Sequence, residues 1–348
     1  MKAVRIHGPG HVVVEEVPDP VMRESTDAIL RVTATSICGT DLHLYNSGVA
    51  GGRRFDLTVG HEFVGIVEDV GSGVRTYRVG DRCVASMFAA CGQCVVCASG
   101  QLTLCSNGGL FGFPRDGGGL QGGQAQFVRI PGADVTLTKI PDGVSDENAL
   151  FTGDILATAY CGLRCGSLAH GETVGVVGAG PVGLMTVICA LNIFGASRVF
   201  VADYVQDRLS IAALHGAVSV DLYDADMVDV VRDQTGGKGV DLAFEAAGNS
   251  ESLAAAFALP VIGGRVVSVG YLRAEKFPIL AAEGHERRLS VSFVTGDPYC
   301  CRAQLLSLVS AGRICPSSII SDRFLLSEAP AAYSAFDARK AVKVVLYP

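Results

Sequence analysis

The chain has 348 residues, of which 49% are hydrophobic and 18% are charged, and its formal net charge is −7. This balance excludes a disordered chain, and the lack of any Lys/Arg cluster argues against a nucleic-acid partner or an anionic membrane surface. No apolar run reaches the roughly eighteen residues that span a bilayer, and the first residues lack the apolar core of a signal peptide. We therefore expect a cytoplasmic protein of two domains.

The first part of the chain, up to about residue 155, contains many short β-like runs separated by glycine turns. Examples are HVVVEEV, DAILRVTATSI and HEFVGIVEDVG. This pattern favours a β-barrel or sandwich. Two residues in it, Cys38 in SICGTDLHLY and His61 in VGHEFVG, are of the types that bind zinc. A catalytic ion needs a third protein ligand, which the spacing alone does not identify.

Four cysteines follow within fifteen residues, in the pattern C-x2-C-x2-C-x7-C: Cys91, Cys94, Cys97 and Cys105. In a reducing compartment, clustered cysteines bind metal more often than they form disulfides. The pattern predicts one tetrahedral zinc ion in a closed, structural site. An iron–sulfur cluster is the alternative, because the first three spacings resemble a ferredoxin run, although the fourth is longer and no proline follows Cys105.

From about Leu156 onward, apolar strands alternate with helical stretches, which predicts a parallel sheet covered by helices. The segment GAGPVG follows the apolar run Thr173–Val177 and precedes a helical stretch, which is the context of a dinucleotide-binding turn. Its glycines would permit the turn, the approach of a pyrophosphate and close helix packing. The expected cofactor-binding residues in this segment are Gly178, Gly180, Pro181, Val182 and Gly183.

Asp203 ends the next strand-like run, RVFVADY, twenty residues beyond Gly183. A carboxylate there can accept hydrogen bonds from the adenosine ribose and would repel a 2′-phosphate, so it favours NAD over NADP. Arg208 lies close by and could instead accommodate that phosphate.

Taken together, these residues resemble the zinc-containing medium-chain alcohol dehydrogenase family. The resemblance covers the whole chain in order, through CGTDLH, GHEFVGIVEDVGSGV, GDRC, the four cysteines, GAGPVG, Asp203 and GVDLAFEAAG. It implies an α/β protein with a GroES-like β-barrel catalytic domain over residues 1–157, a doubly wound Rossmann domain over 158–291, and a return to the catalytic domain over 292–348. It also implies an active site in the cleft between the two domains.

The resemblance also implies the ligands of a catalytic zinc. Many members use a second cysteine where this chain has Asp154, which looks like the aspartate ligand of bacterial secondary-alcohol and formaldehyde dehydrogenases. We therefore expect Cys38, His61 and Asp154 to bind zinc, with Glu62 as an outer or alternating fourth ligand.

Cys161 and Cys165 are the alternatives for the third ligand, although both lie beyond the matching position. Asp41 or Glu68 would support the ligands from behind, since a metal-bound imidazole usually needs a partner.

Thr40 and His43 match the two ends of the family's proton relay. A histidine titrates in the range that such a shuttle needs, while the alternative for His43 is a loop histidine with no catalytic role.

The expected activity is therefore hydride transfer between a primary or secondary alcohol and NAD, giving an aldehyde or ketone, with one catalytic and one structural zinc ion per chain. A polyol or formaldehyde-type dehydrogenase is the near alternative, and a non-catalytic protein that senses NAD(H) is a more distant one. Members of this length are often homo-oligomers, either tetramers or dimers.

Overall fold

The computed structural model describes residues 1–47, 56–115, 118–271 and 277–348, and the chain divides into two compact units. Unit 1 comprises Met1–Asp154, Asp297–Ala311 and Cys315–Pro348; unit 2 comprises Ile155–Gly296 and Gly312–Ile314. The sequence had suggested boundaries after residues 157 and 291. Within the described ranges, no helix has both the length and the hydropathy needed to cross a membrane.

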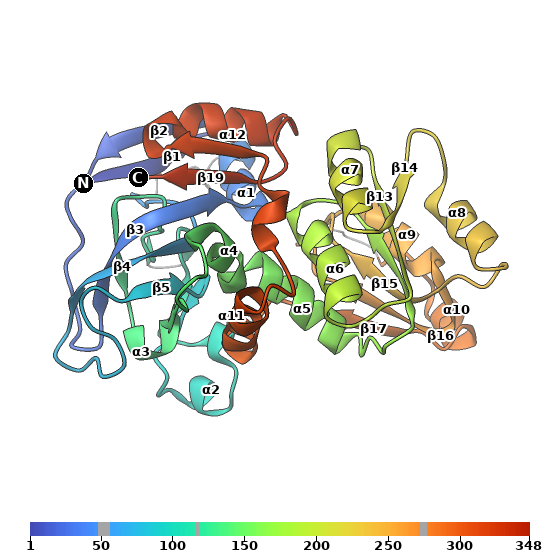
Figure 1. The fold of residues 1–348 in the computed structure, drawn as a ribbon, viewed down its shortest axis with the longest axis horizontal. Helices are drawn as coiled ribbons and strands as arrows, with labels where there is room; N and C mark the ends of the chain where they lie inside the picture. The colour runs from blue at the N-terminus through green and yellow to red at the C-terminus, as the bar shows by residue number, and fades with distance from the viewer. Residues whose placement is uncertain (48–55, 116–117, 272–276) are drawn as a thin grey trace. The chain divides into compact units, whose positions relative to one another are not determined.

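Unit 1 is built on a seven-stranded sheet in the order β11-β5-β4-β3-β19-β18, with β10 also paired to β3. Figure 1 labels β5, β4, β3 and β19 of this sheet. Its strands are β3 (Ala28–Ile37), β4 (Glu62–Val70), β5 (Arg82–Ala85), β10 (Phe127–Ile130), β11 (Leu137–Lys139), β18 (Asp322–Leu325) and β19 (Val344–Tyr347). All pairs are antiparallel except β18 with β19. Because β3 pairs with three other strands, nearly all of its ten residues are buried, which explains its long apolar and β-branched run.

Short elements complete unit 1. The paired strands outside the main sheet are β1 (Lys2–Gly8) with β2 (His11–Glu16), β6 (Phe88–Ala89) with β7 (Gly109–Leu110), and β8 (Pro114–Arg115) with β9 (Gly118–Gly119). The α-helices are α1 (Gly39–Ser47), α2 (Val95–Ala98), α3 (Ala133–Thr136), α4 (Asp146–Leu150), α11 (Arg302–Ser310) and α12 (Ala329–Asp337). The 3₁₀ turns are η1 (Leu102–Leu104), η2 (Phe151–Gly153), η3 (Pro298–Cys300), η4 (Pro316–Ile319) and η5 (Leu326–Glu328).

Two hydrophobic cores hold unit 1 together. One gathers residues of β1, β2, β19 and α12 around the fully buried ring of Tyr333. The other lies between β3, β4 and β5, where the rings of Phe63 and Phe111 meet edge to face at 5.1 Å. Burial of these rings fixes the strands that carry the polar residues described below.

Unit 2 is a six-stranded parallel sheet in the order β14-β13-β12-β15-β16-β17. Its strands are β12 (Thr173–Val177), β13 (Arg198–Asp203), β14 (Val218–Asp221), β15 (Val240–Glu245), β16 (Pro260–Ser268) and β17 (Ser290–Phe293). Its helices are α5 (Ile155–Cys165), α6 (Pro181–Asn192), α7 (Gln206–Leu214), α8 (Met227–Gln234), α9 (Ser250–Ala258) and α10 (Ala281–Glu286). Helix α6 packs on β12 and β13, α7 packs on β13 and β14, and α9 packs on β12, β15 and β16. Figure 1 shows these helices around the sheet.

If the strands of this sheet are numbered along the chain with β12 as strand 1, their order is 3-2-1-4-5-6, which is the order of doubly wound dinucleotide-binding folds. In such sheets the ligand binds beyond the carboxyl ends of the strands, where the strand order reverses. In unit 2 that point lies between β12 and β15. The expected boundary at 292 falls inside β17, which pairs in parallel with β16 and so completes this sheet.

Candidate metal and cofactor sites

The predicted catalytic ligands come together in unit 1. Cys38 directly follows β3, His61 directly precedes β4, Glu62 is the first residue of β4, and Asp154 follows η2. The antiparallel pairing of β3 with β4 sets Ser36 opposite Glu62, which brings the first three residues to one end of the sheet. One ligand atom from each of the four residues lies within 4.8 Å of the other three.

Individual distances within this group are short. His61 Nε2 lies 3.2 Å from Asp154 Oδ2, and Cys38 Sγ lies 3.8 Å from the same oxygen. The alternative thiols, Cys161 and Cys165, are not part of the group, and Cys165 is exposed.

Burial dominates the electrostatics of this cluster, since every member is 9% exposed or less. Burial, together with Glu62 and Asp154, raises the pKa of the Cys38 thiol. Burial would lower the pKa of His61, but the negative charges of Asp41 and Cys38 outweigh it and raise that pKa well above its usual value. The cluster therefore concentrates negative charge in a place where water cannot screen it.

A bound cation fits this donor set. Glu62 Oε1 is buried and has no hydrogen-bond donor among the described residues. A buried carboxylate oxygen without a partner is costly, and a metal ion would satisfy it together with the sulfur, the imidazole and the second carboxylate. Thiolate, imidazole and carboxylate are all zinc ligands.

Lys343 holds the other oxygen of Glu62. Its ammonium group lies 2.6 Å from Glu62 Oε2 and also donates to the carbonyl of Ile37 at 2.9 Å. Both ionic side chains are completely buried, and Ser36 Oγ donates to the same carboxylate. Because Oε2 of Glu62 is held by Lys343 and Ser36, Oε1 is the oxygen left without a hydrogen-bond partner among the described residues.

Asp41 is placed to support His61 from behind. Its Oδ1 lies 3.5 Å from His61 Nδ1, while its Oδ2 accepts from the Cys38 backbone N–H at 3.0 Å. A carboxylate on the far nitrogen of a ligating imidazole fixes the ring and its tautomer. The other candidate acid, Glu68, is half exposed and pairs with Arg31 at the surface.

Thr40 and His43 both lie on α1, one helical turn apart. Thr40 Oγ1 is 3.9 Å from Cys38 Sγ, so its hydroxyl group borders the ligand cluster. His43 is partly buried, and its backbone carbonyl accepts from the Ser47 hydroxyl.

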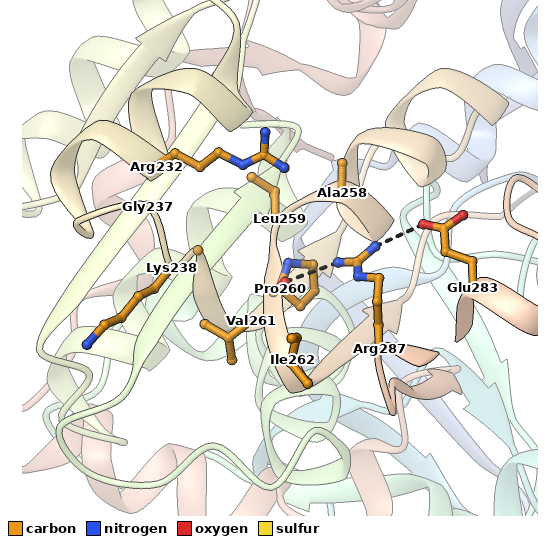
Figure 2. A pocket seen from close by; sticks show the side chains of 11 residues that line it. Arg232, Gly237, Lys238, Ala258, Leu259, Pro260, Val261, Ile262, Glu283 and Arg287 are labelled. Carbon is orange, nitrogen blue, oxygen red and sulfur yellow. Dashed lines mark hydrogen bonds and ion pairs between the residues drawn. The ribbon is translucent and has the colours of Figure 1, made fainter. Parts of the chain in front are cut away.

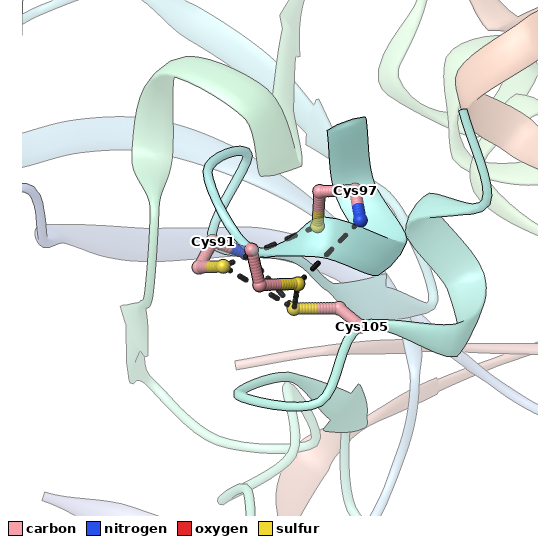
Figure 3. A group of neighbouring side chains, drawn as sticks. Cys91, Cys97 and Cys105 are labelled. Carbon is pink, nitrogen blue, oxygen red and sulfur yellow. Dashed lines mark hydrogen bonds between the residues drawn. The ribbon is translucent and has the colours of Figure 1, made fainter. Parts of the chain in front are cut away.

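The four cysteines of the second motif form a separate cluster in unit 1 (Figure 3). The sulfur–sulfur distances are 3.5 Å for Cys91–Cys105, 3.9 Å for Cys94–Cys105 and 4.0 Å for Cys91–Cys97. A tetrahedron with zinc–sulfur bonds of about 2.3 Å has edges of about 3.8 Å. The cage therefore has the dimensions of a single ion, whereas an iron–sulfur cluster would spread the thiolates over several irons.

Backbone N–H groups favour the thiolate form of Cys94, whereas burial and the neighbouring thiols raise the pKa of Cys97 to about 12. Chiefly the Cys97 N–H, and then that of Ser106, lower the pKa of Cys94 to about 6. Asn107 Nδ2 lies 3.7 Å from Cys91 Sγ, and the Cys91 N–H lies 3.3 Å from Cys105 Sγ. Because the thiolate is the form that binds metal, these contacts suit a zinc site.

The glycine-rich turn of unit 2 lies between β12 and α6. Gly178 has φ of +100°, and a Cβ on Gly183 would lie 1.9 Å from the carbonyl oxygen of Gly178. A Cβ on Gly180 would meet nothing within 4 Å, so that position faces open space. Pro181 opens the twelve-residue helix α6 and Val182 follows it in the first turn. Free N–H groups at this helix start can hold phosphate oxygens, which fits a dinucleotide.

Asp203 is the last residue of β13 and lies beside this turn. Both of its carboxylate oxygens accept hydrogen bonds from backbone N–H groups. Its Oδ2 accepts from the Ala179 N–H at 2.8 Å, and its Oδ1 accepts from the N–H groups of Tyr204 and Val205. Arg208, on α7, lies 3.7 Å from Asp203 Oδ2. The carboxylate therefore fixes the turn, while the arginine offsets part of its charge.

A cavity of about 730 Å³ lies elsewhere in unit 2, at the amino ends of β15 and β16 (Figure 2). Arg287 there donates to the carbonyls of Phe257 and Pro260 and pairs with Glu283. Because ligands of doubly wound sheets bind at the carboxyl ends, this cavity is not the dinucleotide site.

Sequence reasoning missed Lys343 and Gln124. Gln124 Nε2 donates to the Ser36 carbonyl and to Asp41 Oδ2, so it helps to position Asp41. The sequence signal for Lys343 is that it is a lone lysine in the apolar run AVKVVLY. A lysine buried in such a strand needs an acidic partner, so this lysine indicates a nearby carboxylate.

Comparison with known proteins identifies matching families and relatives. Residues 24–142 match the alcohol dehydrogenase GroES-like domain, and residues 181–311 match the zinc-binding dehydrogenase family. A zinc-type alcohol dehydrogenase-like protein of Bacillus subtilis is 34% identical to this chain, and the alignment covers 100% of each of the two chains. The predicted α/β fold, with a GroES-like domain and a Rossmann-type sheet, is confirmed.

Two solved structures share the whole fold. The alcohol dehydrogenase TADH from Thermus sp. ATN1 has a TM-score of 0.94 at 39% identity, over 100% of this chain and 99% of its own. A zinc-binding dehydrogenase from Sinorhizobium meliloti, solved bound to NADP, has a TM-score of 0.88 at 32% identity, with the same coverage.

Substitution of Asp154 by Ala should remove one zinc ion per chain and leave the other, because the cysteine cage is separate from the cluster that contains Asp154. Metal content by mass spectrometry should fall from two ions to one, while Asp142→Asn, at an exposed acid in the same unit, should keep both. Two ions still bound to the Asp154 variant would exclude Asp154 as a ligand.

Substitution of Cys97 by Ser should remove the other ion and destabilise the fold. A closed zinc site contributes folding free energy, and a loss of 1 kcal/mol lowers Tm by about 2–4 °C in a domain of this size. We expect a fall in Tm of about 5 °C or more by calorimetry. Cys315→Ser, at an exposed cysteine of the same unit, is the matched control. A Cys97 variant with unchanged Tm and two ions would rule out a structural role for the cage.

Proposed function

Since the chain belongs to the zinc-containing medium-chain alcohol dehydrogenase family, an oxidoreductase family with a dinucleotide cofactor, we propose that it is an NAD-dependent alcohol dehydrogenase. It would oxidise a primary or secondary alcohol reversibly to the aldehyde or ketone. The observation that carries this proposal is the buried cluster of Cys38, His61, Asp154 and Glu62, in which one oxygen of Glu62 has no hydrogen-bond partner among the described residues. A second zinc ion would be held by the cysteine cage.

Each bound group would supply the chemistry that side chains lack: zinc a Lewis acid that favours the alkoxide, and NAD a hydride acceptor. The chain itself would position the ligands. Asp41 would hold the ring of His61, and Lys343 would hold Glu62 by one oxygen, leaving the other available.

The alcohol proton would be taken up by side chains of α1. Thr40 Oγ1 borders Cys38 Sγ, so its hydroxyl group is the first acceptor in this proposal. His43, one turn further along the helix, would carry the proton on, because an imidazole exchanges protons near neutral pH.

The choice of NAD rests on Asp203. A relative with NADP bound means that family membership alone leaves the cofactor open. The buried Asp203 carboxylate would repel a 2′-phosphate, and Arg208 already lies close to that carboxylate rather than to open space.

The direct test of activity is the initial rate of NADH formation by the zinc-loaded protein with primary aliphatic, secondary aliphatic, aromatic and polyhydroxy alcohols. We expect turnover of at least one class, and turnover of only the polyhydroxy class would identify a polyol dehydrogenase. If NADH binds but no alcohol or formaldehyde is oxidised, the protein is an NAD(H) sensor instead.

Asp203→Asn should weaken the preference for NAD over NADP. Asn removes the charge that repels a phosphate and keeps one of the two oxygens that accept from backbone N–H groups. Measured as a ratio of dissociation constants, the preference should fall by about tenfold, the equivalent of 1.4 kcal/mol. Asp233→Asn, at an exposed acid of α8, should leave the ratio unchanged. An unchanged ratio in the Asp203 variant would remove the argument for NAD.

A further inference from the structure

The cavity at the amino ends of β15 and β16 has no part in the proposed function (Figure 2). Its volume of about 730 Å³ lies in the range of pockets that hold small molecules. The glycine turn follows the carboxyl end of β12, which runs parallel to β15 and β16. A molecule in the cavity and a dinucleotide at the turn would therefore occupy opposite ends of one sheet.

One part of the cavity wall is apolar. Residues 258–262, with the sequence ALPVI, lead from the end of α9 into β16 and line the cavity. The side chain of Ile262 is 76% exposed. Apolar side chains that remain in contact with water inside a concave site favour a ligand with an apolar body.

Arg287 holds this apolar segment in place. Its guanidinium group donates to the carbonyls of Phe257 at 2.8 Å and Pro260 at 3.0 Å, and it pairs with Glu283 at 3.1 Å. Glu283 is the one acid among the described residues that line the cavity, and its charge is offset by this pair.

A glycine-rich turn between α8 and β15 forms another part of the wall and carries Lys238. The Gly237 N–H donates to the Arg232 carbonyl at 2.7 Å, and the Gly239 N–H donates to Thr235 Oγ1 at 2.9 Å. These bonds fix the turn. A Cβ on Gly237 would meet nothing within 4 Å, so a ligand can approach the backbone there. Figure 2 shows Gly237 and Lys238 on one side of the apolar segment and Arg287 on the other.

Arg232 and Lys238 bring two positive charges to the cavity without an acidic partner. Both are exposed, and across the described part of the chain neither side chain forms an ion pair or a hydrogen bond. Because Glu283 balances Arg287, the lining residues carry a net charge of +2 in a chain whose net charge is −7. Such a local excess attracts anions, and an arginine fork matches the two oxygens of a carboxylate or phosphate.

We propose that this cavity is a second small-molecule site, which binds an organic anion. The apolar body of the ligand lies on residues 258–262, and its carboxylate or phosphate group is held by Arg232 and Lys238. This inference does not depend on the proposed function, because the proposed zinc ligands and the dinucleotide turn lie elsewhere in the fold.

The test measures binding of 1-naphthyl phosphate, which combines an apolar body with an anionic group. Its dissociation constant is determined by calorimetry for the zinc-loaded full chain, with and without saturating NADH. We expect binding that NADH leaves unchanged. Arg232→Gln and Lys238→Gln each remove one charged donor and should weaken it by about tenfold or more.

Controls separate this site from a general attraction of anions. Arg313→Gln removes the same charge from an exposed arginine of unit 2 that does not line the cavity, and it should leave the affinity unchanged. The Asp154→Ala variant should also bind as the parent does, which excludes a phosphate bound to the catalytic metal.

Three further compounds test the two halves of the ligand. Neutral 1-naphthamide and inorganic phosphate should each bind at least about tenfold more weakly than 1-naphthyl phosphate. Comparison with 1-naphthoate shows whether the site prefers a carboxylate or a phosphate.

Several results would overturn the proposal. These are no binding of 1-naphthyl phosphate or 1-naphthoate by the parent chain, unchanged affinity in both the Arg232 and Lys238 variants, or equal binding of 1-naphthamide. Displacement by NADH would also do so, because the probe would then lie in the dinucleotide site. Formation of NADH from alcohols is measured separately, so either proposal can fail while the other stands.

Discussion

The buried charge around His61 is the constraint on which the rest of unit 1 depends. Three carboxylates, a thiol, an imidazole and an ammonium group lie together with almost no exposure to water: Asp41, Glu62, Asp154, Cys38, His61 and Lys343. Burial of unpaired charge is strongly unfavourable, and breaking one partner of a buried ion pair costs about 3–5 kcal/mol. The fold must therefore supply a counter-charge for each acid. Lys343 does so for Glu62, and a metal dication would do so for the others.

The surrounding sheet explains why these groups can be held so closely. Strand β3 is the central strand and pairs with β4, β10 and β19. Through β4 it meets Glu62, and through β19 it brings Lys343 to the same place, although the two residues are 281 positions apart in the sequence. Strand β19 is thus part of the environment of the proposed metal ligands, and its docking supplies the positive charge of Lys343 beside Glu62.

Local patterns made part of the molecule predictable. The spacing of Cys91, Cys94, Cys97 and Cys105 predicted a compact cage because all four thiols lie in one short loop. The segment from Gly178 to Gly183 predicted its own turn because only glycine tolerates a φ of +100° or a carbonyl oxygen 1.9 Å from a would-be Cβ. The alternation of strands and helices likewise predicted the parallel sheet.

Features that depend on long-range packing were not predictable in this way. Asp154 was proposed as a ligand only through family resemblance, since nothing in its neighbourhood marks it. Lys343 was missed because its partner lies on another strand. Cys165, Cys300 and Cys315 lie among apolar or small residues in the sequence, yet all three are exposed, since a thiol in such a run can still lie on the outer face of a helix or turn.

The central claim is that the chain moves hydride directly from an alcohol carbon to NAD. The most direct measurement is oxidation of the best alcohol substrate carrying deuterium at the carbinol carbon, with mass spectrometry of the reduced cofactor. The account predicts that each molecule of cofactor formed carries one deuterium and that the Asp154→Ala variant forms none. Reduced cofactor without deuterium, or full activity in that variant, would contradict it.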